Sequence, residues 1–169
     1  MIVRNILRII FGICVFILLE VWFVTKLTLV IAEEYYVLCK PGIYVNVRQN
    51  PARKSEVIGE LELGDRVETD GKEKNGYVHL IGLSFELTEG WIYKGLLIPE
   101  KPYVREFTVQ TISSERVATR YYINGKRKAW VKPGRDVIVY AMGKEWSITN
   151  KGYMMTKFLP INYPTKFEE

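Results

Sequence analysis

The chain has 169 residues and a formal net charge of +5, which is enough for one ordinary domain or two very small ones. Hydrophobic residues make up 48% and charged residues 25%, and this balance excludes disorder as the main state. One His and two Cys exclude a zinc cluster of those ligands and leave little material for His-based acid–base chemistry. The aromatic content of 13% favours strands, because rings suit a pleated, half-buried surface.

The charge is unevenly distributed along the chain. Residues 33–100 carry 8 Lys/Arg and 12 Asp/Glu, a net charge of −4, whereas residues 101–169 carry 13 and 6, a net charge of +7. A basic half attracts an anionic partner, although an ordinary solvated surface can have the same composition.

The amino terminus has the pattern of an export signal. Arg4 and Arg8 precede the uncharged run Ile9–Leu19, and Val30-Ile31-Ala32 supplies the small-residue ending that a signal peptidase prefers. This pattern predicts a signal peptide that is cleaved near Ala32.

An uncleaved membrane anchor is the alternative for the same segment. The span Ile9–Ile31 contains 23 residues, which is long enough to cross a bilayer. Glu20 and Lys26 disfavour that span, because each charge needs a partner or a route to the interface. Both alternatives place residues 33–169 outside the cytoplasm, so an extracytoplasmic location is expected.

After residue 33 the chain breaks into short strand-like runs separated by turn signals. The turn signals include Asp70-Gly71 and Asn75-Gly76. Strands at this spacing, with no helical period, predict a small barrel or sandwich. The predicted runs are Glu34–Cys39, Ile43–Arg48, Glu56–Leu61, Arg66–Thr69, Tyr77–Ile81 and Gly90–Tyr93.

The pattern then repeats after a linker around Pro99 and Pro102. Arg116–Arg120 mirrors Tyr44–Arg48, and Lys132–Val137 mirrors Glu62–Val67. The offset between the copies drifts from 72 residues at Arg48/Arg120 to 62 at Trp91/Tyr153, as loop-length differences between two folded copies would produce. We therefore predict two diverged copies of one small β module.

The first copy resembles the bacterial SH3-like (SH3b) domain. The resemblance covers residues 34–98, although Tyr77 stands where the family more often has Trp. The second copy, residues 105–161, resembles the family less, and it has a predicted hairpin with a two-residue turn at Tyr122–Lys126. The motifs that carry the resemblance are Val45–Pro51, Val57–Leu61, Asn75–Val78 and Gly90–Ile92.

The resemblance implies two tandem small SH3-like β-barrels. An all-β chain of two such barrels is therefore expected after the N-terminal hydrophobic signal or anchor helix. The expected division is a signal peptide or anchor over 1–32, a first domain over 33–99, a linker over 100–104, a divergent second domain over 105–161 and a polar tail over 162–169.

The resemblance also implies a binding protein rather than an enzyme. SH3b domains commonly bind cell-wall peptidoglycan or its peptides, so the expected partner is peptidoglycan or an anionic wall polymer. The alternative is an adaptor that binds another envelope protein. A cysteine peptidase of the NlpC type would need a further domain of about 100 residues, and nothing suggests an acid or amide partner for Cys39 and His79. No cofactor, metal or nucleic-acid partner is expected. Contact with a membrane is expected only through residues 1–32, and only if they are not cleaved.

The aromatic residues supply the candidates for a ligand-binding groove, because large rings with a polar tip can stack on sugars or peptides. A purely structural role in the core is the alternative, above all for Trp91, Trp146 and Tyr153. The candidates are Tyr44, Tyr77, Trp91, Tyr93, Tyr121, Tyr122, Trp130 and Trp146.

A basic cluster in the second copy supplies the candidates for anion binding. It surrounds Trp130, and it would attract wall phosphates or lipid headgroups with strong salt dependence. A solvated hairpin without a ligand is the alternative. The candidates are Lys126, Arg127, Lys128, Lys132 and Arg135.

Overall fold

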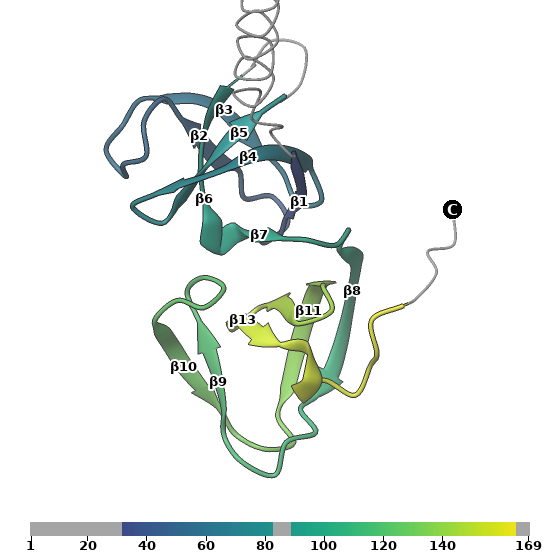
Figure 1. Cartoon of the computed structure of the whole chain (residues 1–169). Helices are drawn as coiled ribbons and strands as arrows, with labels where there is room; N and C mark the ends of the chain where they lie inside the picture. Colours follow the sequence, from purple (N-terminus) through teal and green to yellow (C-terminus); the bar gives the residue numbers. More distant parts are fainter. Residues whose placement is uncertain (1–31, 83–88, 165–169) are drawn as a thin grey trace, which may run out of the picture. The chain divides into compact units, whose positions relative to one another are not determined.

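The computed structural model describes residues 32–82 and 89–164, which contain thirteen strands and two short 3₁₀ helices (Figure 1). Ala32–Glu169 group into one compact unit. The predicted signal or anchor, apart from Ala32, and the last five residues of the predicted tail lie outside the described residues. Within the described ranges, no helix has the length and apolar character needed to cross a bilayer.

The first sheet is antiparallel and has the strand order β3-β2-β6-β5-β4-β1-β7. The 3₁₀ helix η1 (Lys94–Leu96) connects β6 to β7. The strands are β1 (Glu33–Val37), β2 (Val45–Arg48), β3 (Val57–Leu61), β4 (Arg66–Lys74), β5 (Tyr77–Ile81), β6 (Glu89–Tyr93) and β7 (Leu97–Ile98).

The second sheet has the order β10-β9-β13-β12-β11-β8, so its six strands repeat the order of the first six strands of the first sheet. The 3₁₀ helix η2 (Thr156–Phe158) follows its last strand, as η1 follows β6. The strands are β8 (Tyr103–Gln110), β9 (Val117–Arg120), β10 (Arg127–Val131), β11 (Asp136–Met142), β12 (Trp146–Thr149) and β13 (Gly152–Met155).

The all-β class is confirmed, but the prediction of closed barrels is wrong. The first sheet ends at β3 and β7, and the second at β10 and β8, with no pairing between the end strands in the described residues. In the first sheet the physical reason is the length of β7. It contains two residues, and both pair with β1, so no ladder continues to β3.

Alternating side chains build a separate core for each sheet. In β2 and in β9 every second residue is buried, with Val45 and Val47 in the first strand and Val117 and Thr119 in the second. Such alternation places one face of each strand against the core. The buried core of the first sheet consists of Val37, Cys39, Val45, Val47, Val67, Val78, Leu80, Ile92 and Leu97, and that of the second of Val117, Val131, Val137, Val139, Met142, Met154 and Leu159.

Two predicted turns differ in the structure. The predicted turn at Asp70-Gly71 is part of β4, where the register shifts between Thr69 and Glu73, so this Gly marks a β-bulge rather than a chain reversal. The predicted two-residue turn of the second copy is a longer connection over residues 121–126, because the strand pairing stops at Arg120↔Arg127.

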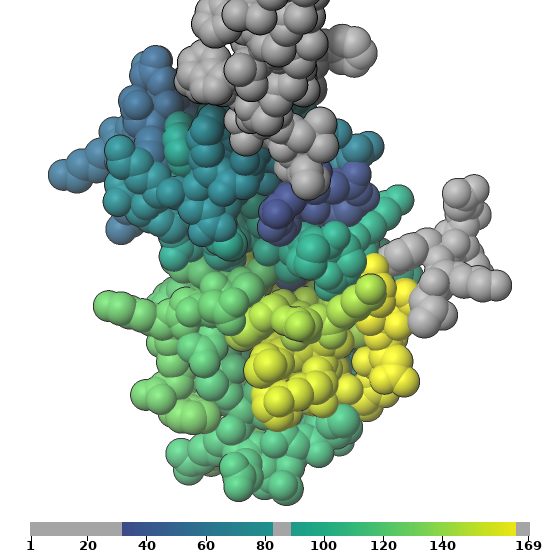
Figure 2. Space-filling model, in the orientation of Figure 1, coloured from purple at the N-terminus to yellow at the C-terminus, as the bar shows by residue number. Residues whose placement is uncertain are grey.

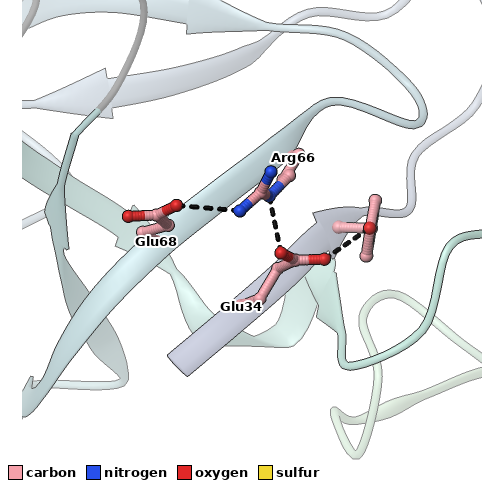
Figure 3. Close-up of polar contacts among 4 residues, drawn as sticks. Glu34, Arg66 and Glu68 are labelled. Carbon is pink, nitrogen blue, oxygen red and sulfur yellow. Dashed lines mark hydrogen bonds and ion pairs between the residues drawn. The ribbon is translucent and has the colours of Figure 1, made fainter. Parts of the chain in front are cut away.

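An exposed ion-pair network joins β1 to β4. Arg66 lies between two carboxylates, with its Nε 2.6 Å from Glu34 Oε2 and its Nη2 2.9 Å from Glu68 Oε1 (Figure 3). About half of each side chain is exposed, and exposed ion pairs contribute about 1 kcal/mol or less. The network therefore helps to fix the register of β1 rather than the stability of the sheet.

A third cluster of buried side chains contains residues of both sheets. Leu38 and Ile98 come from the first half, and Ala141, Trp146, Ile148 and Tyr153 come from the second. The Tyr153 hydroxyl donates a hydrogen bond to the Leu38 carbonyl at 2.5 Å, and the Ile123 amide donates to the Gly95 carbonyl at 2.9 Å. We call this region the junction.

Candidate functional site

A groove of about 700 Å³ lies at the junction, and both sheets line it. Its walls come from β2 and the segments on either side of it, from the β4–β5 turn, from β5, β6 and η1, from the connection after β9 and from the second sheet. The lining residues are Cys39, Lys40, Ile43, Tyr44, Val45, Asn46, Arg48, Pro51, Ala52, Arg53, Asn75, Tyr77, Tyr93, Leu96, Tyr121, Tyr122, Ile148 and Tyr153.

Three tyrosine rings form a continuous row in the groove and connect the two sheets. Tyr77 and Tyr93 are cross-strand neighbours on β5 and β6, with ring centroids 5.5 Å apart in an edge-to-face arrangement. Tyr93 and Tyr122 have centroids 4.9 Å apart, also edge-to-face. Pairs of this geometry contribute about 0.5–1.5 kcal/mol beyond their buried area, so the row also holds the junction together.

Gly95 permits the close approach of the two sheets at this row. A Cβ atom at this position would lie 2.7 Å from Tyr93 Cε1, 3.0 Å from Tyr122 Cβ and 3.3 Å from the Ile123 carbonyl oxygen. Any larger residue would push η1 away from the connection after β9. The row of rings therefore depends on this Gly.

The outer part of the groove is exposed to solvent. Tyr44 and Tyr121 are each 56% exposed, and Tyr122 is 43% exposed. Large exposed rings around a concave surface are unusual unless they contact a partner, because they leave apolar area in water. These rings are available to stack on a ligand.

The charges that line the groove are all positive. Lys40, Arg48 and Arg53 line it, and no Asp or Glu is among its lining residues. Arg48 has a structural task as well, because its Nη1 donates a hydrogen bond to the Ser55 carbonyl at 2.6 Å and so holds the loop that carries Arg53. Sequence reasoning missed these three cations, although Lys40 and Arg53 lie in polar segments beside predicted strands.

The structure brings together five of the eight predicted groove residues: Tyr44, Tyr77, Tyr93, Tyr121 and Tyr122. The three Trp residues lie elsewhere. Trp91 tilts against the His79 ring at 4.9 Å, Trp146 is buried in the junction cluster with 7% exposure, and Trp130 is 51% exposed on β10.

The five predicted anion-binding residues form an exposed surface on β10 and its flanking turns, which we call the basic hairpin. Figure 2 shows this segment, in green, on the surface of the face that is drawn. Among the described residues none of the five cations forms an ion pair, but two lie over aromatic rings. Arg127 is 4.7 Å from the Trp130 ring centroid, and Lys128 is 5.9 Å from that of Tyr121. The basic hairpin therefore adjoins the groove at Tyr121.

Cys39 and His79 have separate partners. Cys39 is buried, and its Sγ donates to the Ile43 carbonyl at 3.2 Å. Burial, together with the charges of Asp65 and Glu62, raises the pKa of this thiol to about 11, so the nucleophilic thiolate is scarce at neutral pH.

His79 Nδ1 lies 3.0 Å from Asp70 Oδ2, and Lys72 also pairs with this carboxylate. Burial alone would raise the pKa of Asp70. Hydrogen bonds from Lys72 and His79 outweigh burial and lower it to about 2. Within the described ranges, no group of three or more His, Cys, Asp or Glu side chains could hold a metal ion.

Comparison with known proteins gives one family. Residues 43–98 match the family model of the bacterial SH3 domain. This range lies within the residues 34–98 predicted from the motifs. It contains β2 to β7 of the first sheet and none of the strands of the second, so the match concerns the first sheet. That residues 105–161 form a second such domain stays a prediction.

The matched range supplies most of the groove lining, from Ile43 to Leu96. Cys39 and Lys40 precede it. The remaining lining residues come from the connection after β9 (Tyr121 and Tyr122) and from the second sheet (Ile148 and Tyr153). The groove is therefore made by the range that matches the bacterial SH3 domain together with the segments before and after it.

No curated protein matches the chain. Among solved structures, NlpC2 from Trichomonas vaginalis is 15% identical, with a TM-score of 0.34, over 83% of this chain and 52% of that chain. NlpC1 from Trichomonas vaginalis is 16% identical, with a TM-score of 0.34, over 80% of this chain and 48% of that chain. The chain thus spans about half the length of each of these two structures.

Proposed function

We propose that the protein is an exported, non-enzymatic binding protein that recognises a bacterial cell-wall component, either peptidoglycan or an anionic wall polymer. The observation that carries this proposal is the groove at the junction, which six tyrosines line. Three of them lie in the range that matches the bacterial SH3 domain. Its volume of about 700 Å³ lies within the range of small-ligand sites. Tyr rings offer apolar faces for sugars or peptides and hydroxyls for hydrogen bonds.

Two features support a second SH3-like module in the second sheet. The strand order is the same in both sheets. Arg48 and Arg120 also play the same part, since each donates from Nη1 to a carbonyl of the loop that follows its strand, at 2.6 Å from Ser55 O and from Gly125 O respectively. A groove between two modules would require both, which gives a physical reason for keeping them on one chain.

The proposed protein is exported and does not catalyse a reaction, and separate features support each of these two properties. The basic residues and apolar run before Ala32 support export. The buried thiol of Cys39, with its raised pKa and its bond to a backbone carbonyl, supports a structural role for this residue.

An adaptor that binds another envelope protein is the second candidate. The open outer edges of β3 and β10 favour it, because an unpaired strand edge can accept a strand from a partner. Charged residues on β10 make that edge less suitable, so β3 is the edge to test.

Co-sedimentation of the full chain with purified Gram-positive sacculi tests the proposal, in a non-ionic detergent and with teichoic acids kept or stripped. We expect binding to stripped sacculi, and we expect the double variant Tyr44→Ala/Tyr121→Ala to weaken it. The triple variant Lys126→Ala/Arg127→Ala/Lys128→Ala is the matched comparison for the basic hairpin, and it should affect only binding that needs teichoic acids. Failure to bind either preparation would overturn the proposal in favour of the adaptor.

A further inference from the structure

We propose that the junction groove is a carboxylate site, which takes a short peptide with a free carboxylate near Arg53 and its body on the tyrosine rings. This inference rests on the proposed function, because it names the class of ligand that the same groove would bind. Three independent features of the groove lead to it.

The first feature is the selection of charges. Residues 33–100 carry more acidic than basic side chains, 12 against 8. Three of those eight cations nevertheless line the groove, whereas none of the described Asp or Glu side chains does. A groove with this lining attracts an anion although the surrounding half of the chain is negative overall.

The second feature is that the Arg53 side chain of the groove has no partner among the described residues. Arg53 is exposed, and it forms no ion pair or side-chain hydrogen bond in the part of the chain that the structure describes. Arg48 anchors the loop of Arg53 through its hydrogen bond to the Ser55 carbonyl. A guanidinium group binds a carboxylate with two parallel hydrogen bonds, so Arg53 is well suited to a peptide carboxylate.

The third feature is the set of phenol groups. The hydroxyls of Tyr44, Tyr77, Tyr93, Tyr121 and Tyr122 make no hydrogen bond within the described ranges. A Tyr hydroxyl can both donate and accept. Five such groups around one groove can therefore serve a ligand rich in carbonyl and amide groups, and a peptide has both.

A peptide fits these features better than the other wall components do. A neutral sugar chain could stack on the rings, but it would offer no ion-pair partner to the exposed guanidinium of Arg53. A long phosphate polymer needs an extended row of cations, and the basic hairpin offers such a row outside the groove. The groove combines few cations with many rings, as a short peptide with one or two carboxylates requires.

Calorimetric titration of the full chain in a non-ionic detergent tests the inference. The probes are a synthetic wall-type tetrapeptide with free carboxylates, the same peptide with its carboxylates amidated, chitobiose as a neutral sugar and a glycerol-phosphate polymer. We expect the amidated peptide to bind about tenfold more weakly or worse, because it loses a charge-assisted hydrogen-bond pair.

The variant Arg53→Ala should remove the preference for the free carboxylates. Arg116→Ala is the matched control, since Arg116 is also exposed, lines no part of the groove and carries the same charge. Arg53→Glu should reduce binding of the acidic peptide further while the amidated peptide binds as before.

Equal affinity for the two peptides, no binding of either, or equal losses in the Arg53 and Arg116 variants would overturn the inference. Tighter binding of chitobiose or of the phosphate polymer in the groove would do the same. If sacculi still sediment the protein in those cases, the proposed function stands and only the carboxylate site fails. If the free peptide binds as expected but sacculi do not, the wall function fails and the carboxylate site stands.

Discussion

The hydrogen bond from Tyr153 to Leu38 links the two sheets through a buried donor and a buried acceptor. Tyr153 is 4% exposed and Leu38 is fully buried. Burial raises the pKa of the Tyr153 hydroxyl above its ordinary value, so it remains a neutral donor. Replacing Tyr153 by Phe keeps the ring and its packing but removes the proton that the Leu38 carbonyl accepts.

The expected cost is about 1–3 kcal/mol in the free energy of unfolding, because a buried acceptor loses its partner. That cost corresponds to an increase of about 5- to 150-fold in the unfolding equilibrium constant. Urea unfolding of residues 32–169, the compact unit, followed by Trp fluorescence, measures it. A single transition for both sheets is expected as well, since they share the junction cluster.

Tyr36→Phe is the matched control. The Tyr36 hydroxyl donates to Glu34 at 2.5 Å, but this bond is exposed, so water can replace the lost partner and the cost should be below about 0.5 kcal/mol. Equal losses in the two variants would refute the argument that burial of the junction bond determines its contribution.

Three further predictions follow from single contacts. Gly152→Ala should lower the free energy of unfolding by more than about 2 kcal/mol, because the added Cβ would lie 2.6 Å from the Arg120 carbonyl oxygen. Gly134→Ala is also at positive φ but has nothing within 4 Å of the added Cβ, so it should lower that free energy by about 1 kcal/mol. Similar urea midpoints for the two variants would contradict this reasoning. The stabilisation from the Asp70 carboxylate should be complete above its usual pKa of 3.8 and disappear as the pH falls through about 2, so wild type and Asp70→Asn should differ in stability at pH 6 and converge near pH 2. Cys39 should react with iodoacetamide at pH 8 at least about 100-fold more slowly in the native protein than in urea, because its native pKa of about 11 leaves little thiolate. A native rate close to the rate in urea would show that the thiol is accessible.

Local sequence patterns located several strands of this protein. Tyr77–Ile81 was predicted with the bounds that the structure has, because a strand with one buried face alternates in sequence. The SH3-type motifs predicted the domain that the family comparison finds over residues 43–98. The export signal was predicted from residues that the structure does not describe, and it stays a prediction.

Other local features depended on contacts that a sequence does not display. The Asp70-Gly71 pair has the composition of a turn, yet β4 continues through it as a bulge paired with β5. Trp146 is of a residue type that often binds ligands, yet it is buried beside Leu38 and Ile98. Whether such a residue serves a turn, a core or a surface is decided by the strand or side chain packed against it.

The groove is the clearest case of a feature decided by the tertiary structure. The sequence identified Tyr44, Tyr77, Tyr93, Tyr121 and Tyr122 as candidates, because large rings with a polar tip can stack on sugars or peptides. It assigned them to two separate modules, since no local pattern reports which surfaces of two folded units meet. Burial of Leu38 and Tyr153 between the sheets brings the five rings to one groove, and packing between distant segments is the physical reason that the sequence alone could not place them together.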